Sequence, residues 1–566
     1  MSARVAGSRS TPRVAALALA AALALTGCSE DEPTDSPAPE KISITITDDE
    51  VSPLGERVEV PAGEPFTVEI TADRAGEMHV HSNPEQEWAF EEGTTTIEAT
   101  LDQPGSPRSS CTTPTWSCSS SKSADVDGTY SAHGLGGAKD LPIPAEFAVV
   151  GAVAALVVSF VVLAIAWRNP RFESMERSRP LPQLQAVVES TAARVAMAVV
   201  GLLASAYLGL TLVAGQDLET NPAFGMVYVL LWVGIVPASL VLGPVWKAFS
   251  PFRAVNAVLS RLLRVDPETG LYAFPERLGL WLAAAGLYAF VWLELVSPSQ
   301  TALGTLRLWI TVYAVAMVLG ALLFGNRFLA AADPFEVYSS LLARLSVWGR
   351  RADGRLVLVS PLRNLASTPP SPGLPAVMAV LLGSTAYDSF RESPPWVKFL
   401  QTNEIDQTLL NNLALAGFVL LAGAILTLGT MATGLAPGAR RLDLPRRYAH
   451  SMTPPIVVGY MVAHYFSYLV VLGQTTVIQM SDPLSRGDDW FGTGGWAVNH
   501  SIAYQATALA VMKVVAVVTG HVLGAVASHD RAMTLLPKEH QVRGQLSLLV
   551  AMVAFTAGGL FLLFAS

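Results

Sequence analysis

Long apolar runs divide most of this chain into segments of membrane-spanning length. A helix of about 20 apolar residues crosses the hydrocarbon core of a bilayer. The pattern therefore predicts a polytopic α-helical membrane bundle of about ten spans, of which the sixth is short and interrupted by Gly383 and Ser384. The expected spans are residues 147–167, 195–215, 223–243, 278–296, 306–324, 373–390, 408–432, 450–472, 503–527 and 545–565.

Residues 41–101 follow a different pattern, in which apolar and polar positions alternate. The runs ISITIT, ERVEV, FTVEI and TTTIEATL are separated by Gly and Pro. Alternation at period two predicts short strands with one buried face. We therefore expect a small extracytoplasmic β-sandwich over residues 29–123. A linker, residues 124–146, joins it to the transmembrane helical domain, residues 147–566.

The segment 106–123, SPRSSCTTPTWSCSSSKS, has no period and interrupts the sandwich where a final strand pair is expected. One explanation is a frameshift, because a shifted frame of GC-rich codons is compatible with an alternating strand pair. On this hypothesis the N-terminal domain is truncated at 106–123. The nucleotide sequence decides the matter, since a shifted frame that encodes no strand-like segment contradicts it.

The first 28 residues resemble a secretory signal. Three arginines precede the apolar run VAALALAAALALTG, which ends at Cys28. This arrangement is typical of a signal peptide rather than of a membrane helix. The ending LTGC resembles a bacterial lipobox, which implies lipidation of Cys28; the alternative is an ordinary signal peptide with a chance cysteine.

Composition and loop charge support a membrane location and give an orientation. The chain is 51% hydrophobic and 15% charged, which excludes an ordinary soluble globule. If the N-terminal domain lies outside, the inner loops carry 23 Lys and Arg residues and the outer loops only four, as the positive-inside rule requires. We expect a multi-pass protein of the bacterial plasma membrane. Its basic residues are spread over short loops, which disfavours a nucleic-acid partner.

Polar residues that interrupt the C-terminal spans are the first candidates for chemistry. An ionisable group inside a span suggests a functional site. Imidazole and carboxylate groups can bind Zn, Cu or Fe and activate a water molecule, or can relay protons. The alternative is that each histidine only hydrogen-bonds to a neighbouring helix. The residues concerned are His464, Lys513 and His521 within the spans, with His464 and His521 as the proposed core pair, and His529 and Asp530 where the ninth span ends at the inner surface.

A second group of polar residues is expected near the outer mouth of the bundle. Asp482 belongs to the loop 473–502, which we interpret as a cap or, alternatively, as a solvated loop. Glu294 ends the fourth span and Asp388 ends the sixth, so both carboxylates can face that mouth. Buried carboxylates need partners, and Lys513 is an available cation.

The N-terminal alternation resembles the cupredoxin-type domains of bacterial secreted proteins. This resemblance implies that Met78, His79 and His81 begin a copper site. Thioether and imidazole ligands suit copper. The alternative is a sandwich of the same fold that binds no metal.

Several short motifs in the membrane part resemble the bacterial integral-membrane family of fenitrothion hydrolases over roughly residues 130–540. The motifs are AHGLGGAKDLPIP, WVGIVPASLVLGPVWKAFSPFRAV, DPFEVYSSLLARL, LLGSTAYDSF, AHYFSYLVVLGQ with SDPLSRGDDWFGTGG, and GHVLGAVASHDRA. The resemblance implies hydrolysis of a phosphotriester. The positions that it carries over are His133, Asp140, Trp246, Asp333, Asp388, His464, Asp482, His521, His529 and Asp530.

Two functions follow as alternatives. The first is a membrane-bound hydrolase of a small-molecule substrate, with His464, His521 and Asp530 as catalytic candidates and a divalent metal as a candidate cofactor. The second is handling or transport of copper or another metal ion, captured by the outer domain. A redox role with haem-ligating histidines is a third alternative. The lipid bilayer is the expected partner in every case.

Overall fold

A computed structural model describes residues 41–47, 50–52, 65–81, 86–100, 108–113, 116–117, 140–176, 178–435 and 438–565. The signal segment with Cys28 and the expected linker up to residue 139, including His133, lie outside these ranges. Helix α3 (Ala145–Ala166) begins within two residues of the expected start of the membrane domain.

The N-terminal domain consists of two four-stranded sheets, ordered β2-β1-β3-β6 and β5-β4-β7-β8. Strand β1 pairs in parallel with β3, and the other pairings are antiparallel. Phe66, Val68 and Ile70 of β3 pack with Phe90 of β5, so side chains from both sheets share one core. The alternating pattern thus correctly predicted β1, β3 and β6, whereas the run ERVEV, residues 56–60, lies outside the described ranges. The bounds are β1 (Lys41–Thr47), β2 (Glu50–Ser52), β3 (Pro65–Ala72), β4 (Gly76–His81), β5 (Gln86–Phe90), β6 (Gly93–Thr100), β7 (Arg108–Thr113) and β8 (Trp116–Ser117).

The aperiodic segment 106–123 contains strands after all. Strand β7 pairs with β4, with Met78 opposite Cys111, and β8 pairs with β7. Backbone hydrogen bonding alone builds such a ladder, whatever the side chains. The strand pair is therefore present in the encoded sequence, and the frameshift stays a hypothesis for the nucleotide sequence to test.

Seven helices of the described chain are long and apolar enough to cross a membrane. They coincide with seven of the ten expected spans. Their bounds are α3 (Ala145–Ala166), α5 (Thr191–Ala214), α11 (Leu303–Phe324), α17 (Gln407–Met431), α18 (Leu444–Gln479), α19 (Ala506–Leu535) and α20 (Leu546–Ala565).

The three remaining expected spans are helical but irregular. The third is a pair bent by 42°, which counts as an eighth span if it is one broken helix; it comprises α6 (Pro222–Phe224), π-helix η2 (Gly225–Val233) and α7 (Ile235–Leu242). The fourth, α10 (Trp281–Leu295), has 15 residues. The sixth, α15 (Leu374–Arg391), has 18 residues and carries Asp388 and Arg391 in its last turns. Ten spans were predicted, and seven or eight meet the length and hydropathy requirements.

Shorter elements connect these helices. A small sheet joins β9 (Arg179–Pro180), β10 (Trp348–Arg350) and β11 (Leu356–Leu358). The short helices are α4 (Pro182–Val188), α8 (Val245–Phe249), α9 (Pro251–Leu263), η3 (Glu276–Leu278), α12 (Asn326–Ala332), α13 (Pro334–Leu342), η4 (Ala343–Leu345), α14 (Pro361–Ala366), α16 (Pro394–Thr402), η5 (Arg441–Asp443), η6 (Ser501–Gln505), η7 (Lys538–His540) and η8 (Arg543–Gln545).

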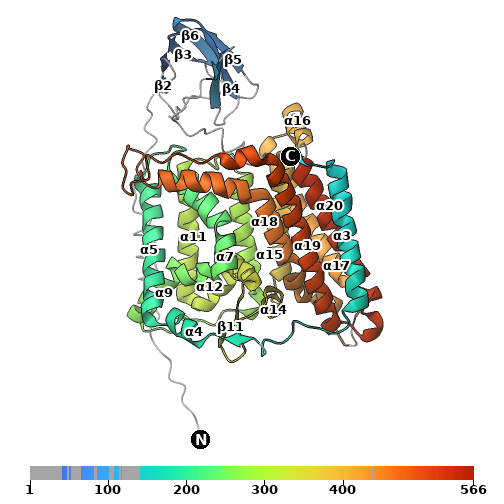
Figure 1. Cartoon of the computed structure of the whole chain (residues 1–566). Helices are drawn as coiled ribbons and strands as arrows, with labels where there is room; N and C mark the ends of the chain where they lie inside the picture. The colour runs from blue at the N-terminus through green and yellow to red at the C-terminus, as the bar shows by residue number, and fades with distance from the viewer. Residues whose placement is uncertain are drawn as a thin grey trace. The chain divides into compact units, whose positions relative to one another are not determined.

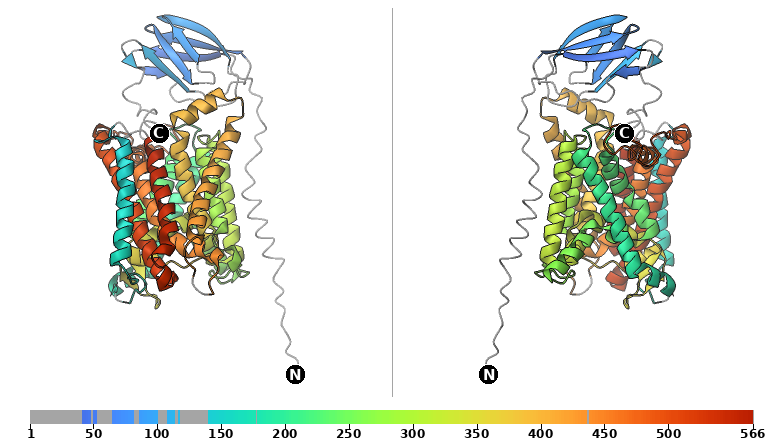
Figure 2. Two further views of the ribbon diagram at one scale, coloured as in Figure 1. Left: turned by 90° about the vertical axis from the view of Figure 1, so that its right-hand side faces the viewer. Right: turned by 90° about the vertical axis from the view of Figure 1, so that its left-hand side faces the viewer.

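Helix α18 packs closely against α19, and this packing fixes the depths of His464, His521 and His529 relative to one another. Figures 1 and 2 show α19 and α20 beside α3, and side chains of α3, α18, α19 and α20 form one apolar cluster. A Cβ on Gly520 would lie 2.5 Å from Pro455 O, and one on Gly459 would lie 2.6 Å from Ala516 O. Small residues let helix backbones approach in this way. The two helices are antiparallel, with Gly459 level with Gly520.

Candidate functional site

Asp388 is the centre of a buried polar network between α15 and α18. Its side chain is 1% exposed and accepts hydrogen bonds from His464, Tyr465 and Arg391. His464 Nε2 lies 3.0 Å from Oδ2, the hydroxyl of Tyr465 lies 2.5 Å from Oδ2, and Arg391 Nε lies 3.0 Å from Oδ1. Three donors, one of them a guanidinium, stabilise an ionised carboxylate.

His464 connects this carboxylate to a serine. Its Nδ1 lies 3.3 Å from the hydroxyl of Ser389, which lies 2.6 Å from the hydroxyl of Tyr460. An ionised Asp388 only accepts hydrogen bonds, so His464 Nε2 must carry the proton. In the neutral tautomer with the proton on Nε2, Nδ1 is the acceptor and Ser389 is the donor to it. The order of the chain is Tyr460, Ser389, His464, Asp388.

Further charges surround this network. Glu294 interacts electrostatically with Asp388 and Arg391, and its buried Oε2 has no hydrogen-bond partner among the described residues. Arg391 also donates to the carbonyl of Leu295, beside Glu294 on α10. The cation that interacts with both carboxylates is thus Arg391. Lys513, expected in that role, interacts instead with Asp140 and Glu392.

His521, His529 and Asp530 lie away from this network. With Gly459 level with Gly520, residue 464 is level with about residue 515. His521 then lies about 9 Å and His529 about 21 Å farther along the helix axis at 1.5 Å per residue. The structure therefore separates the residues proposed as one metal site.

Each of these distant residues has local partners of its own. His521 Nδ1 lies 2.8 Å from Val517 O. The two ring nitrogens of His529 lie 3.0 Å from Gln545 Oε1 and 2.9 Å from Trp167 O. Asp530 accepts from the indole of Trp167 and from the backbone of the segment that follows it. In the described part of the chain, no three His, Cys, Asp or Glu residues are placed to hold a metal ion.

The outer loop organises its own turns. Asp482 accepts from the backbone amides of Arg486 and Gly487, at 2.9 and 2.7 Å. Asp489 accepts from Gly494 N at 2.9 Å, and this hydrogen bond, followed by that of Ser481, lowers the pKa of the Asp489 carboxyl. Both carboxylates shape the loop, since all these partners belong to the loop itself.

Two further groups were carried over by resemblance: Trp246 with Asp333 in the membrane part, and the candidate copper ligands on β4. Trp246 Nε1 donates to Asp333 Oδ2 at 2.9 Å, and Asp333 also caps the N-terminus of α13. Met78, His79 and His81 are consecutive or near-consecutive residues of β4, which lies between β5 and β7.

Sequence reasoning missed four members of the network: Ser389, Arg391, Tyr465 and Glu392. Asp388 and Arg391 are spaced i, i+3, which is a helical ion-pair signal. No sequence pattern marks Ser389, because its proposed role depends on its contact with His464, which lies 75 residues away along the chain.

Comparison of the chain with models of protein families, with curated proteins and with solved structures gives no match.

Proposed function

We propose that this protein is a membrane-embedded hydrolase in which Ser389, His464 and Asp388 act as a nucleophile, a general base and its orienting carboxylate. The observation that carries the proposal is the hydrogen-bonded order Ser389, His464, Asp388 inside the bundle. A nucleophile, a base and a group that orients the base are the recurring parts of acyl- and phosphoryl-transfer sites. The resemblance to fenitrothion hydrolases suggests a phosphotriester as the substrate class.

The chemistry balances with these groups alone. Ser389 Oγ attacks phosphorus while its proton moves to His464 Nδ1, and Asp388 stabilises the imidazolium through Nε2. The ester oxygen leaves with the proton from Nδ1, and a phosphorylated serine remains. Water then attacks phosphorus and gives one proton to His464 Nδ1, which passes it to Ser389 Oγ as the bond between phosphorus and Oγ breaks, so that a phosphodiester is released and both residues are regenerated.

Neighbouring donors support the same assignment. Tyr460 donates to Ser389 in the resting state and can turn to a phosphoryl oxygen when Ser389 attacks. Arg391 keeps Asp388 ionised, because a guanidinium remains charged at all physiological pH values. Ser389 is fully buried, so the proposal requires α15 and α18 to separate when substrate enters.

The test compares two serines of the same helix. Ser389→Ala should lower hydrolysis of a p-nitrophenyl phosphotriester by about 10²–10⁴-fold, the usual worth of a positioned proton-transfer partner and its nucleophile. Ser384→Ala is the control, since Ser384 is equally buried and its hydroxyl donates only to Leu381 O. Equal rates for the two variants would refute the proposal.

A second proposal, metal handling by the N-terminal domain, is supported by the clustering of Met78, His79 and His81 on β4. Copper content of the full-length protein tests it. His79→Ala with His81→Ala should abolish copper binding, whereas His500→Ala, in the exposed outer loop, should retain it. Copper retained by the double variant would contradict this proposal.

A further inference from the structure

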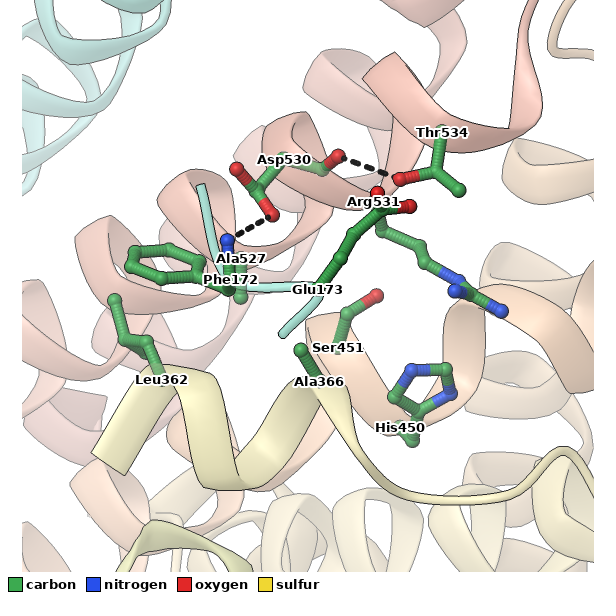
Figure 3. A pocket seen from close by; sticks show the side chains of 10 residues that line it. All are labelled: Phe172, Glu173, Leu362, Ala366, His450, Ser451, Ala527, Asp530, Arg531 and Thr534. Atoms are coloured by element: carbon green, nitrogen blue, oxygen red, sulfur yellow. Dashed lines mark hydrogen bonds between the residues drawn. The ribbon is translucent and has the colours of Figure 1, made fainter. Parts of the chain in front are cut away.

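A cavity of about 140 Å³ lies between α14, α18, α19 and the segment after α3. Figure 3 shows the side chains around it. This volume accommodates several water molecules or one small oxyanion. The lining residues are Phe172, Glu173, Leu362, Ala366, His450, Ser451, Ala527, Asp530, Arg531 and Thr534.

His450 is the unusual member of this lining. Its side chain is 0% exposed, yet neither ring nitrogen has a hydrogen-bond partner among the described residues. Buried polar atoms in folded proteins are almost always hydrogen-bonded, and leaving two unpaired is costly. The cavity is therefore the place where a partner for the imidazole must sit.

The charges around His450 favour an anion. Arg531 and Arg344 both interact electrostatically with the ring. Arg531 donates from Nε to Arg447 O at 3.3 Å, and among the described residues its two terminal nitrogens have no hydrogen-bond partner. Glu173 and Asp530 interact with Arg531 only electrostatically. Figure 3 shows its guanidinium on the same side of the cavity as His450.

The two acidic residues of the lining do not cancel this preference. The carboxylate of Asp530 is on the opposite side of the cavity from the His450 ring (Figure 3). It is already paired with the indole of Trp167 and with two backbone amides. Glu173 is exposed, so solvent screens its charge.

We propose that this cavity binds a small oxyanion of the phosphate class between His450 and Arg531. Arginine binds phosphate oxygens with its planar fork. A neutral imidazole offers one N–H donor and one acceptor. Phosphate at neutral pH carries both a hydroxyl donor and acceptor oxygens, so it can pair with the ring nitrogen that faces it whether that nitrogen donates or accepts. Sulfate has only acceptor oxygens and pairs only with a ring nitrogen that carries a proton.

This site is distinct from the proposed hydrolytic site. His450 and His464 are 14 residues apart on α18, or about 21 Å along the axis. The binding proposal uses no residue of the Ser389, His464 and Asp388 chain, so each proposal can fail without the other.

Two phosphate sources have the same chemistry, and the experiment separates them. The full-length protein in phosphate-free detergent is titrated with inorganic phosphate or sulfate by calorimetry. The same protein in nanodiscs of phosphatidylcholine, with or without phosphatidic acid, is compared by its thermal unfolding midpoint. Binding of free phosphate, or stabilisation by phosphatidic acid alone, supports the proposal and identifies the source. No response to either overturns it.

Variants test the residues. Arg531→Gln and His450→Phe should each weaken the phosphate response by about tenfold or more, the worth of a charge-assisted or buried hydrogen bond. Arg446→Gln is the control on α18, because Arg446 pairs with Asp443 at the surface. If Arg531→Gln does not fold, His450→Phe and Arg531→Lys carry the test. An unchanged response in His450→Phe overturns the assignment.

Discussion

Replacing the Asp388 carboxylate should destabilise the membrane domain far more than replacing a similar carboxylate at the surface. Asp388 and Arg391 form an i, i+3 ion pair in which the side chains are 2% and 26% exposed. Asp443, at the N-cap of α18, and Arg446 have the same spacing, but their side chains are 32% and 41% exposed. The two pairs thus differ in burial and in the hydrogen bonds that Asp388 also accepts from His464 and Tyr465.

The expected magnitudes follow from that difference. In Asp388→Asn, the donors His464, Tyr465 and Arg391 face one amide oxygen, which accepts hydrogen bonds, and one NH₂ group, which does not. Breaking a buried charged pair in this way costs about 3–5 kcal/mol. Asp443→Asn breaks an exposed pair, which contributes about 0–1 kcal/mol.

Unfolding in mixed micelles by increasing SDS, followed by tryptophan fluorescence, measures both variants. A further variant separates the charge pair from the rest of the network. If the cost arises from an unpaired guanidinium, Asp388→Leu combined with Arg391→Met should be less destabilised than Asp388→Leu alone. Asn variants that agree within about 1 kcal/mol would refute the reasoning.

Three further predictions follow. Gly383→Ala should destabilise the bundle, because the new Cβ would lie 2.5 Å from the α17 backbone. Gly417→Ala should be neutral or slightly stabilising, because a Cβ there meets nothing within 4 Å. The thermal unfolding midpoints of the two variants measure the difference. The pKa of the Asp489 carboxyl is lowered in the folded loop. Its contribution to the stability of the loop is therefore present at pH values above the ordinary pKa of about 3.8 and is lost as the pH falls through the lower pKa of the folded state. Amide exchange in the loop should show this loss, and Asp489→Asn should abolish the pH dependence. Arg253→Lys should lower the thermal unfolding midpoint, because lysine cannot make the bidentate hydrogen bonds that Arg253 donates to buried Glu336. An unchanged unfolding midpoint would contradict this.

The spans could be predicted because bilayer thickness imposes one length on every crossing helix. Seven expected segments meet that requirement outright. The third segment bends at the junction of a π-helix and Ile235, beside Gly234, and such bulges have no simple hydropathy signal. The sixth carries the Asp388–Arg391 ion pair in its last turns. Its sequence is therefore less apolar than that of other helices that are buried as deeply.

The candidate site was only partly predictable. Asp388 and His464 were identified singly, because ionisable groups stand out in apolar spans. Their contact depends on how α15 and α18 rotate about their axes, which one sequence does not specify. The rise of 1.5 Å per residue already separates His464, His521 and His529 by depth in the sequence. What the sequence does not specify is the local partners of each histidine, such as Val517 O for His521.

Peptide mapping after exposure to a phosphotriester tests the central claim most directly. The protein is incubated with a slowly hydrolysed p-nitrophenyl phosphotriester, quenched in acid and digested. We expect a phosphoryl adduct on Ser389, accompanied by stoichiometric p-nitrophenol, and no adduct on that peptide in Ser389→Ala or His464→Ala. Turnover of the ester with an unmodified Ser389 at every time point would contradict it.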